Sequence, residues 1–230
     1  GQWWLLFDDP VLHGLIARVD LNNQNLKVAA ANVAQAQALL RQQQAEGAPQ
    51  LGAQASQQRS GGDDRATSGA ASINLNASWA PDLWGRIREA VNAQSASVQA
   101  SEADLAGARL NAQASLAEAY LALRATDAEI ALMDDIIAGY QRNARITQNR
   151  YDVGVAPRTD TFQAESTLQS AQATRVALQR ARAAYEHASA LLVGEAPAGL
   201  SIAPAPWSAE VPALPAGLPS RLLLRRPDVA

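Results

Sequence analysis

The 230-residue chain carries 19 basic and 22 acidic residues, and its formal net charge of -3 lacks the basic excess that is typical of nucleic-acid-binding proteins. Hydrophobic residues make up 48% of the chain but aromatic residues only 5%, with alanine filling much of the difference, which suits long or assembled helices with a thin core. Cysteine is absent, which excludes disulfides and cysteine metal sites. The sequence contains no run of about 18 apolar residues, so it predicts no membrane-spanning helix.

The first predicted region, residues 1–48, is helical. Asp9-Pro10 is typical of a helix start, because aspartate caps free backbone N–H groups and proline suits the first helical position. Asn22-Asn23 interrupts the pattern and predicts two stacked helices, and Gly47 suits a C-terminal cap. A coiled-coil-like face repeats every seven residues through Leu12, Val19, Leu26, Val33 and Leu40.

The next region, residues 49–80, is predicted to form a β-hairpin. Its arms run from Pro49 to about Ser60 and from Gly69 to Trp79, and the glycine–aspartate stretch 61–64 forms the turn. Strict alternation of apolar and polar residues in the second arm predicts a strand with one apolar and one polar face. Each arm has about the ten residues that a tilted transmembrane strand needs. A soluble hairpin packed on the helices stays open as an alternative, because the barrel-strand signal is weak per segment.

A long helical hairpin is predicted over residues 81–194. The stretch from Gly85 to Tyr151 contains no proline and carries two columns of mostly apolar residues at seven-residue spacing. A helix of about 67 residues would be about 100 Å long, which no small globular domain uses. The turn 152–157 ends this helix, and we expect Thr159 or Asp160 to cap a fourth helix that reaches about Gly194.

The last region, residues 195–230, predicts a proline-rich linker followed by the start of a further element at Leu222–Arg226. The predicted fold class is therefore mainly α with a β-hairpin, built on long antiparallel, coiled-coil-like helices.

The sequence offers no candidate chemistry. It contains no phosphate-binding loop of the G-x-x-x-x-G-K type. His13 and His187 lie far apart, lack metal-ligand spacing and are interpreted as helix-surface residues. Asp134-Asp135 is interpreted as solvated, and no nucleophile–base set stands out. We therefore expect neither an enzyme nor a protein with a cofactor or a metal ion.

Four motifs, in the same order, resemble those of the outer-membrane factors of tripartite efflux pumps, the TolC/OprM group, which includes NodT-type lipoproteins. The first is the opening from Trp3-Trp4 to Leu15-Ile16, and the second is the stretch Trp79–Arg88, in which Ala80 replaces the acidic residue usual in the family. The third is the tip from Arg150 to Glu165, and the fourth is the end from Pro219 to Asp228. Together they extend over nearly the whole chain.

The resemblance implies a homotrimer in the bacterial outer membrane that extends into the periplasm. In the family, each subunit has two repeats, and three subunits close a twelve-stranded transmembrane β-barrel above a tunnel of helices. This chain resembles the first repeat. The sequence shows no counterpart of the lipidated N-terminal cysteine of the lipoprotein members, so either that residue was removed or this member never had it. Such a channel would export drugs or other small molecules passively, together with a periplasmic adaptor protein and an inner-membrane pump of the RND type.

The resemblance also assigns roles to residues. Ile73, Leu75, Ala77 and Trp79 are expected to face lipid, whereas Asn74, Asn76 and Ser78 face the water-filled lumen. The periplasmic tip is expected to contact the adaptor through Tyr151, Asp152, Val153, Gly154, Val155 and Asp160. A plain helix–helix turn stays open as the alternative for this tip. For the whole chain, the alternatives are a periplasmic adaptor and a structural coiled-coil protein.

Overall fold

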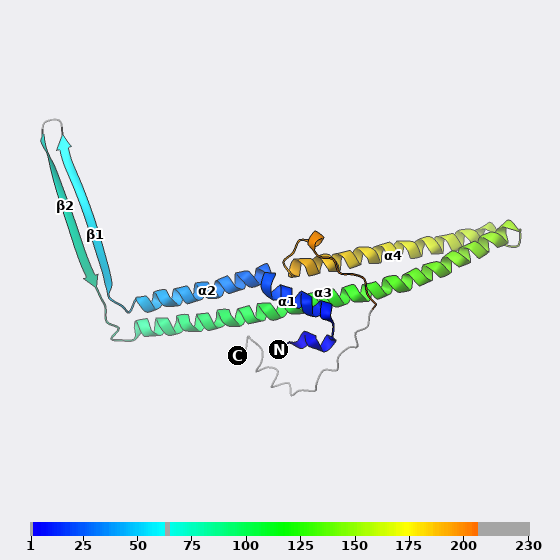
Figure 1. The fold of residues 1–230 in the computed structure, drawn as a ribbon, viewed down its shortest axis with the longest axis horizontal. Coiled ribbons are helices and arrows are strands. Elements are labelled where there is room, and N and C mark those ends of the chain that lie inside the picture. Colours follow the sequence, from blue (N-terminus) through cyan, green and yellow to red (C-terminus); the bar gives the residue numbers. More distant parts are fainter. Residues whose placement is uncertain (1, 63–64, 207–230) are drawn as a thin grey trace. The chain divides into compact units, whose positions relative to one another are not determined.

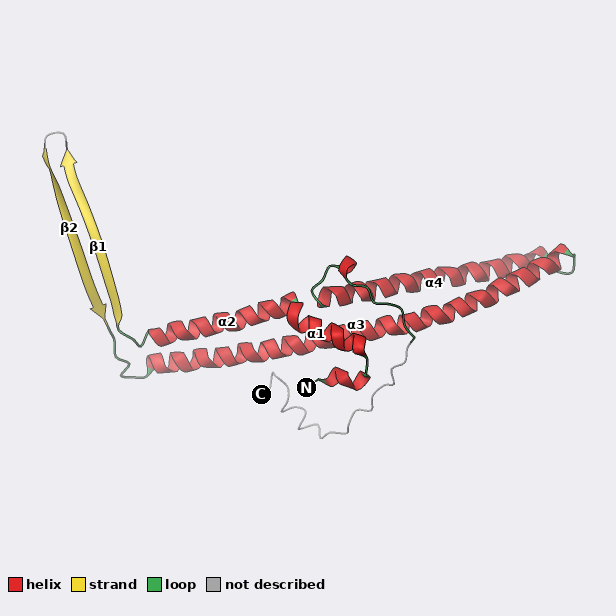
Figure 2. Ribbon diagram, viewed as in Figure 1, coloured by secondary structure: helices red, strands yellow, loops and turns green. Residues whose placement is uncertain are grey.

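The computed structural model describes residues 2–62 and 65–206, which are mainly helical with one two-stranded sheet (Figures 1 and 2). The predicted fold class is confirmed at this level. The elements in chain order are the 3-10 helix η1 (Trp3–Phe7), α1 (Pro10–Asn22), α2 (Gln24–Ala45), β1 (Gln50–Gly62), β2 (Arg65–Ser78), α3 (Arg86–Asp152), α4 (Arg158–Leu192) and the 3-10 helix η2 (Pro197–Gly199).

These elements belong to two units, residues 1–28 with 106–230 and residues 29–105. The sequence-based division at residues 48, 80 and 194 followed element type rather than contact, and it stays a prediction. Among the described residues, no helix has the length and apolar character required to cross a membrane. The segment Leu222–Arg226, predicted to begin a further element, lies outside the described residues.

Helix α1 begins as its sequence predicts. The Asp9 carboxylate accepts hydrogen bonds from the amides of Val11 at 2.8 Å and Leu12 at 3.1 Å, and Pro10 occupies the first helical position. The helix ends at Asn22, and α2 begins at Gln24, so the predicted interruption is confirmed. Helix α2 ends at Ala45, next to the predicted end at Glu46-Gly47, but the predicted role of Gly47 is wrong, because Gly47 lacks the positive φ of a left-handed glycine cap.

The core of the first unit lies where α1, α3 and the end of α4 meet. Residues of the predicted seven-residue columns are buried there, including Leu12 and Val19 of α1 and Leu116 and Leu123 of α3. Trp3 and Phe7 of η1 pack against this cluster, and their rings meet edge to face at 6.4 Å. The heptad spacing therefore marks the packed faces near this core.

Helices α3 and α4 run side by side to a tight turn (Figure 1). Helix α3 has 67 residues, as the missing prolines predicted. The predicted cap of α4 is wrong, because α4 begins at Arg158 and places Thr159 and Asp160 inside its first turn. Pro157 is the N-cap, since its extended backbone (φ -72°, ψ 155°) supplies the non-helical geometry of that position without a side-chain hydrogen bond.

Candidate functional site

The strand hairpin is the first part of the chain that carries predicted functional residues. β1 and β2 pair in antiparallel register, with Leu51 opposite Ala77, Ala53 opposite Leu75 and Ala55 opposite Ile73. Residues opposite each other in an antiparallel pair point to the same face of the sheet. The register therefore places the apolar side chains of residues 50–56 and 72–78 on one face.

The opposite face of the hairpin is polar. It carries Gln50, Gln54, Ser56 and Gln58 of β1 and Ser72, Asn74, Asn76 and Ser78 of β2. The hydroxyls of Ser56 and Ser72 lie 2.8 Å apart across the strands. Gly52 stands opposite Asn76, and a Cβ at this glycine would lie 2.5 Å from the Asn76 side-chain oxygen, so the missing side chain makes room for the amide.

Both faces of the hairpin are exposed over residues 50–59 and 69–78. Leu51, Ile73 and Leu75 are each about four-fifths exposed, at 84%, 79% and 82%. Exposed leucines and isoleucines that share one face form a surface that requires an apolar partner. The outer edges of β1 and β2 also have unpaired backbone groups, because the described sheet has two strands.

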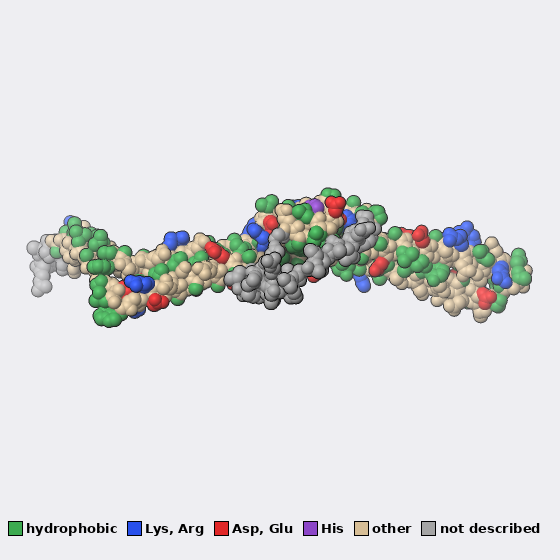
Figure 3. Space-filling view, turned by 90° about the horizontal axis from the view of Figure 1, so that it is seen from below, with side chains coloured by type: hydrophobic (Ala, Val, Ile, Leu, Met, Phe, Trp, Pro, Cys, Tyr) green, Lys and Arg blue, Asp and Glu red, His purple; other side chains and the backbone are tan. Residues whose placement is uncertain are grey.

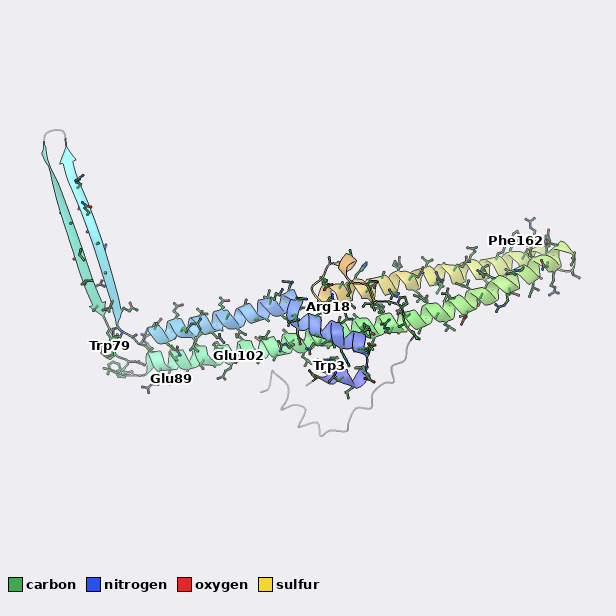
Figure 4. The ribbon with its side chains drawn as sticks, in the orientation of Figure 1. Trp3, Arg18, Trp79, Glu89, Glu102 and Phe162 are labelled. Carbon is green, nitrogen blue, oxygen red and sulfur yellow. The ribbon has the colours of Figure 1, made fainter. Side chains whose placement is uncertain are left out.

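Trp79 and its neighbours join this hairpin to helix α3. The indole N–H of Trp79 donates to the carbonyl of Gly47 at 3.1 Å, which ties the end of β2 to the segment before β1 (Figure 4). Trp84 follows on the connecting segment and is 90% exposed. Asp82 accepts a hydrogen bond from the amide of Arg88 at 2.9 Å, and this bond holds the pKa of Asp82 below its ordinary value.

The second part is the turn between α3 and α4, and the six residues predicted to contact an adaptor lie in this turn and in the adjoining ends of the two helices. The amide of Gly154 donates to the carbonyl of Tyr151 at 2.8 Å, and that of Val155 donates to Arg150 at 2.9 Å. Gly154 has a φ of +78°. This bonding pattern with a left-handed glycine is a Schellman C-cap, in which Gly154 supplies a conformation that other residues adopt only with strain.

Apolar side chains on and near this turn are exposed. Val153 and Val155 lie on its surface, and Phe162 of α4 is half-exposed beneath the guanidinium of Arg158, 5.1 Å from its ring centre. Figure 4 places Phe162 close to the turn. In Figure 3, hydrophobic patches are interspersed with polar and charged surface along the face shown.

A shallow groove follows the turn along the two helices. It has a volume of about 250 Å³ and is lined mostly by polar side chains, namely Asn143, Thr147, Arg150, Asp160, Gln163 and Thr167, together with Ala156 and Ala164. Asp160 is thus the predicted tip residue that lines this groove. Tyr151 and Asp152 end α3, and Val153, Gly154 and Val155 belong to the turn itself.

The sequence interpretation missed a buried ionic network at the base of the helical hairpin. Asp127 of α3 accepts hydrogen bonds from Arg182 of α4 at 2.6 Å and from Arg124 at 3.2 Å. Arg124 also donates to the carbonyl of Ala203 at 2.7 Å, and Arg182 donates to that of Ile202 at 2.6 Å. The network therefore fastens the segment after η2 to the base of both helices.

Tyr120 extends this network to the start of α1. Its hydroxyl donates to the Asp9 cap and accepts a hydrogen bond from Arg124 at 2.9 Å. Burial, reinforced by the Asp9 carboxylate, raises the pKa of Tyr120 to about 12, so the phenol stays neutral at physiological pH. Burial alone would lower the pKa of Arg124, but its bonds to Tyr120 and Asp127 outweigh burial and raise it.

Asn23 joins α2 to the end of α4. Its side-chain oxygen accepts from the amide of Leu26 at 3.2 Å and caps α2, while its side-chain nitrogen donates to the carbonyl of Leu192 at 2.7 Å. Gly194 follows α4 with a φ of +74°, and a Cβ there would lie 2.4 Å from the carbonyl oxygen of Asn22. The negative, C-terminal end of the α4 dipole thus lies at the positive, N-terminal end of the α2 dipole.

The two histidines differ in their surroundings. His187 is exposed, as predicted, but His13 is half-buried, with a buried Nε2 that lacks a partner among the described residues. Within residues 2–62 and 65–206, no three His, Asp or Glu side chains gather as metal ligands would.

Comparison with known proteins finds relatives along the whole chain. A family model described as outer membrane efflux protein matches residues 15–195. The pyoverdine export outer membrane protein OpmQ of Pseudomonas aeruginosa is 32% identical over an alignment of 242 residues that covers 100% of this chain and 51% of the relative. The toluene efflux pump outer membrane protein TtgF of Pseudomonas putida is 31% identical over an alignment of 237 residues that covers 99% of this chain and 49% of the relative. The chain therefore spans about half the length of the relatives it matches.

Solved structures agree with these relatives. The outer-membrane channel OprN matches with a TM-score of 0.86 at 29% identity, covering 98% of this chain and 53% of that structure. CusC, whose structures address folding and transmembrane channel formation, matches with a TM-score of 0.83 at 26% identity, covering 99% of this chain and 54% of the structure. The resemblance to TolC/OprM-type proteins is confirmed.

Proposed function

Because this chain belongs to the outer membrane efflux protein family, we propose that it forms part of an outer-membrane channel that exports small molecules passively from the periplasm. The register of the strand hairpin carries this proposal, since over residues 50–56 and 72–78 it gathers the apolar side chains of both strands on one face and the polar side chains on the other. A strand pair with this pattern suits a wall with lipid on one side and water on the other.

The exposed edges of the hairpin support closure with further strands. β1 and β2 have 13 and 14 residues, enough for the roughly 9–11 residues of a tilted membrane strand. Unpaired backbone groups are costly in lipid, so such a hairpin requires neighbours on both sides and finally a closed barrel. We propose that Ile73, Leu75, Ala77 and Trp79 face lipid, that Asn74, Asn76 and Ser78 face the lumen, and that copies in a homotrimer supply the neighbouring strands.

The turn between α3 and α4 is the proposed docking site for a periplasmic adaptor protein. Exposed Val153 and Val155 offer apolar contacts, and the groove beside them offers polar ones. We propose that Tyr151, Asp152, Val153, Gly154, Val155 and Asp160 take part. An inner-membrane pump would supply the energy for transport, so the channel itself requires no catalytic group.

The named activities of the relatives define the proposed substrate class. OpmQ is named for pyoverdine export and TtgF for toluene efflux. We propose that this chain likewise serves the export of small molecules. The neutral serine and amide side chains of the polar strand face suit a permissive lumen, because they bind no charged solute strongly.

Single-cysteine labelling of the complete gene product in its membrane tests the proposal. Asn74 and Leu75 are adjacent but point to opposite faces. We expect a cysteine at position 74 to react with a water-soluble, membrane-impermeant maleimide and a cysteine at position 75 to be shielded from it. When the cysteine at position 75 carries a membrane-permeant fluorescent maleimide instead, a lipid-phase spin label should quench its fluorescence. Equal reactivity at both positions would support the soluble-hairpin alternative and overturn the channel.

A further inference from the structure

Arg59 is the one charged residue in the stretches 50–59 and 69–78 of the hairpin, and it lies on the apolar face. The register pairs Arg59 with Gly69, without a bulge between this pair and the pair Leu51–Ala77. Arg59 therefore shares its face with Leu51, Ile73 and Leu75, and with Gln57 between them, rather than with the serine and amide side chains of the opposite face. A guanidinium on a lipid-facing surface is costly at the bilayer centre and tolerated near its boundary.

The spacing along the hairpin places Arg59 at such a boundary. Trp79 follows directly after the pair Gln50–Ser78, and Gly69, the partner of Arg59, precedes Trp79 by ten residues along β2. Ten residues span about 34 Å along a strand and about 25 Å along the membrane normal at a tilt of about 45°. An outer-membrane barrel has an apolar band about 25 Å tall with aromatic residues at its edges. If Trp79 marks one edge, Arg59 lies at the other.

The neighbours of Arg59 suit a charged ligand at that edge. Gln57 separates it from the apolar band, and Gly69 opposite has open space where a side chain would stand. The Arg59 side chain is exposed. A planar guanidinium can bind two phosphate oxygens at once, which distinguishes arginine from lysine.

We propose that Arg59 binds the phosphate of an anionic lipid headgroup, at the membrane boundary opposite Trp79. This inference rests on the proposed function, because it requires the apolar face of the hairpin to face lipid. The bound phosphate compensates the charge of Arg59 and, together with Trp79, fixes the depth of the hairpin in the bilayer.

The test compares lipid retention by the complete gene product and its variants. The protein is equilibrated with vesicles of phosphatidylcholine alone or of equimolar phosphatidylcholine and phosphatidylglycerol, and retained lipid is counted by native mass spectrometry. We expect Arg59→Gln to lower phosphatidylglycerol retention about fivefold per subunit, in line with the contribution of one arginine near an anionic surface. Arg59→Lys should keep an intermediate retention, which also shows that the site tolerates substitution.

A matched double variant separates face from charge. Gln58→Arg with Arg59→Gln keeps the net charge but moves the arginine by one residue to the polar face. We expect it to retain as little phosphatidylglycerol as Arg59→Gln alone. Equal retention by the wild type and either glutamine-bearing variant would overturn the inference, as would displacement of the lipid by millimolar inorganic phosphate, which would indicate a site for free anions. If labelling at positions 74 and 75 still alternates, only the lipid site fails; if it does not, the proposed channel fails with it.

Discussion

Replacing Asp127 by alanine removes the shared carboxylate of the buried network, and we expect a large loss of stability. The side chains of Asp127, Arg124 and Arg182 are 4%, 8% and 15% exposed. Without Asp127, Arg124 keeps no carboxylate partner in the network, and Arg182 keeps Glu186 at 3.3 Å. Breaking a buried ion pair on one side typically costs about 3–5 kcal/mol, because the remaining charge is buried without compensation.

The chain contains a matched control one heptad away. Asp134 of α3 pairs with Arg175 of α4, seven residues from Asp127 and Arg182 in each helix, but these side chains are 49% and 34% exposed. Exposed pairs contribute about 0–1 kcal/mol, since water screens both charges. Asp134→Ala should therefore cost much less than Asp127→Ala, although it removes the same type of pair from the same two helices.

Urea unfolding of the complete gene product in detergent, followed by far-ultraviolet circular dichroism, measures the free energy of unfolding of both variants. The comparison is valid when this free energy falls with urea concentration at the same slope in both. Hydrogen exchange supplies a local readout, since the Ala205 amide donates to Asp127 at 3.4 Å and should exchange faster only in Asp127→Ala. Equal losses in the two variants, or an unchanged free energy of unfolding for Asp127→Ala, would refute the argument that burial decides the strength of these pairs.

Three further substitutions test other features. Gly154→Val should introduce about 1–2 kcal/mol of local strain at φ +78° and reduce drug export by cells. Gly154→Asn should keep most of the export, because asparagine tolerates this conformation. Normal export by the valine variant would count against the docking role of the turn. Asn23→Ala should lower the free energy of unfolding by about 1–3 kcal/mol, because both the α2 cap and the bond to Leu192 are lost, while Asn23→Asp should keep the cap and lose less. The free energy of unfolding of the wild type should fall by about 2–3 kcal/mol between pH 10 and 12, because unfolded tyrosine ionises near pH 10 while the pKa of folded Tyr120 is about 12. In urea titrations at several pH values, Tyr120→Phe should lose less free energy of unfolding over this window. An equal loss in both proteins would contradict the assignment to Tyr120.

The extended features of the fold follow from local patterns in the sequence. The missing prolines between residues 85 and 151 predicted a helix that the structure places at Arg86–Asp152, because nothing in that stretch interrupts backbone hydrogen bonding. The alternation around Asn74 predicted one polar and one apolar face, and pairing with β1 extends both faces across two strands. These local sequence patterns were sufficient to predict both elements, since each element depends on neighbours a few residues away along the chain.

The buried network could not be predicted in the same way. Arg124 and its partner Ala203 are 79 positions apart, and Arg182 and Ile202 lie on either side of η2. In sequence, Asp127 and Asp134 look alike, because both stand on α3 one heptad apart opposite an arginine of α4. What distinguishes them is the segment after η2, which covers the first pair. The repeated Asp–Arg spacing was the available signal, but only the fold shows which pair is buried.

Along the hairpin of α3 and α4, packing is unevenly distributed. Near its base, large side chains such as Leu116, Tyr120 and Leu123 are fully buried. From residue 138 to residue 160, every side chain is exposed or half-buried, and the nearest buried side chains on α4 are Thr161 and Ala164. Regions with few buried apolar contacts open at a lower free energy than the core does. We therefore expect the turn around Gly154 to open at a lower free energy than the base of the hairpin, which would suit the docking role proposed for the turn.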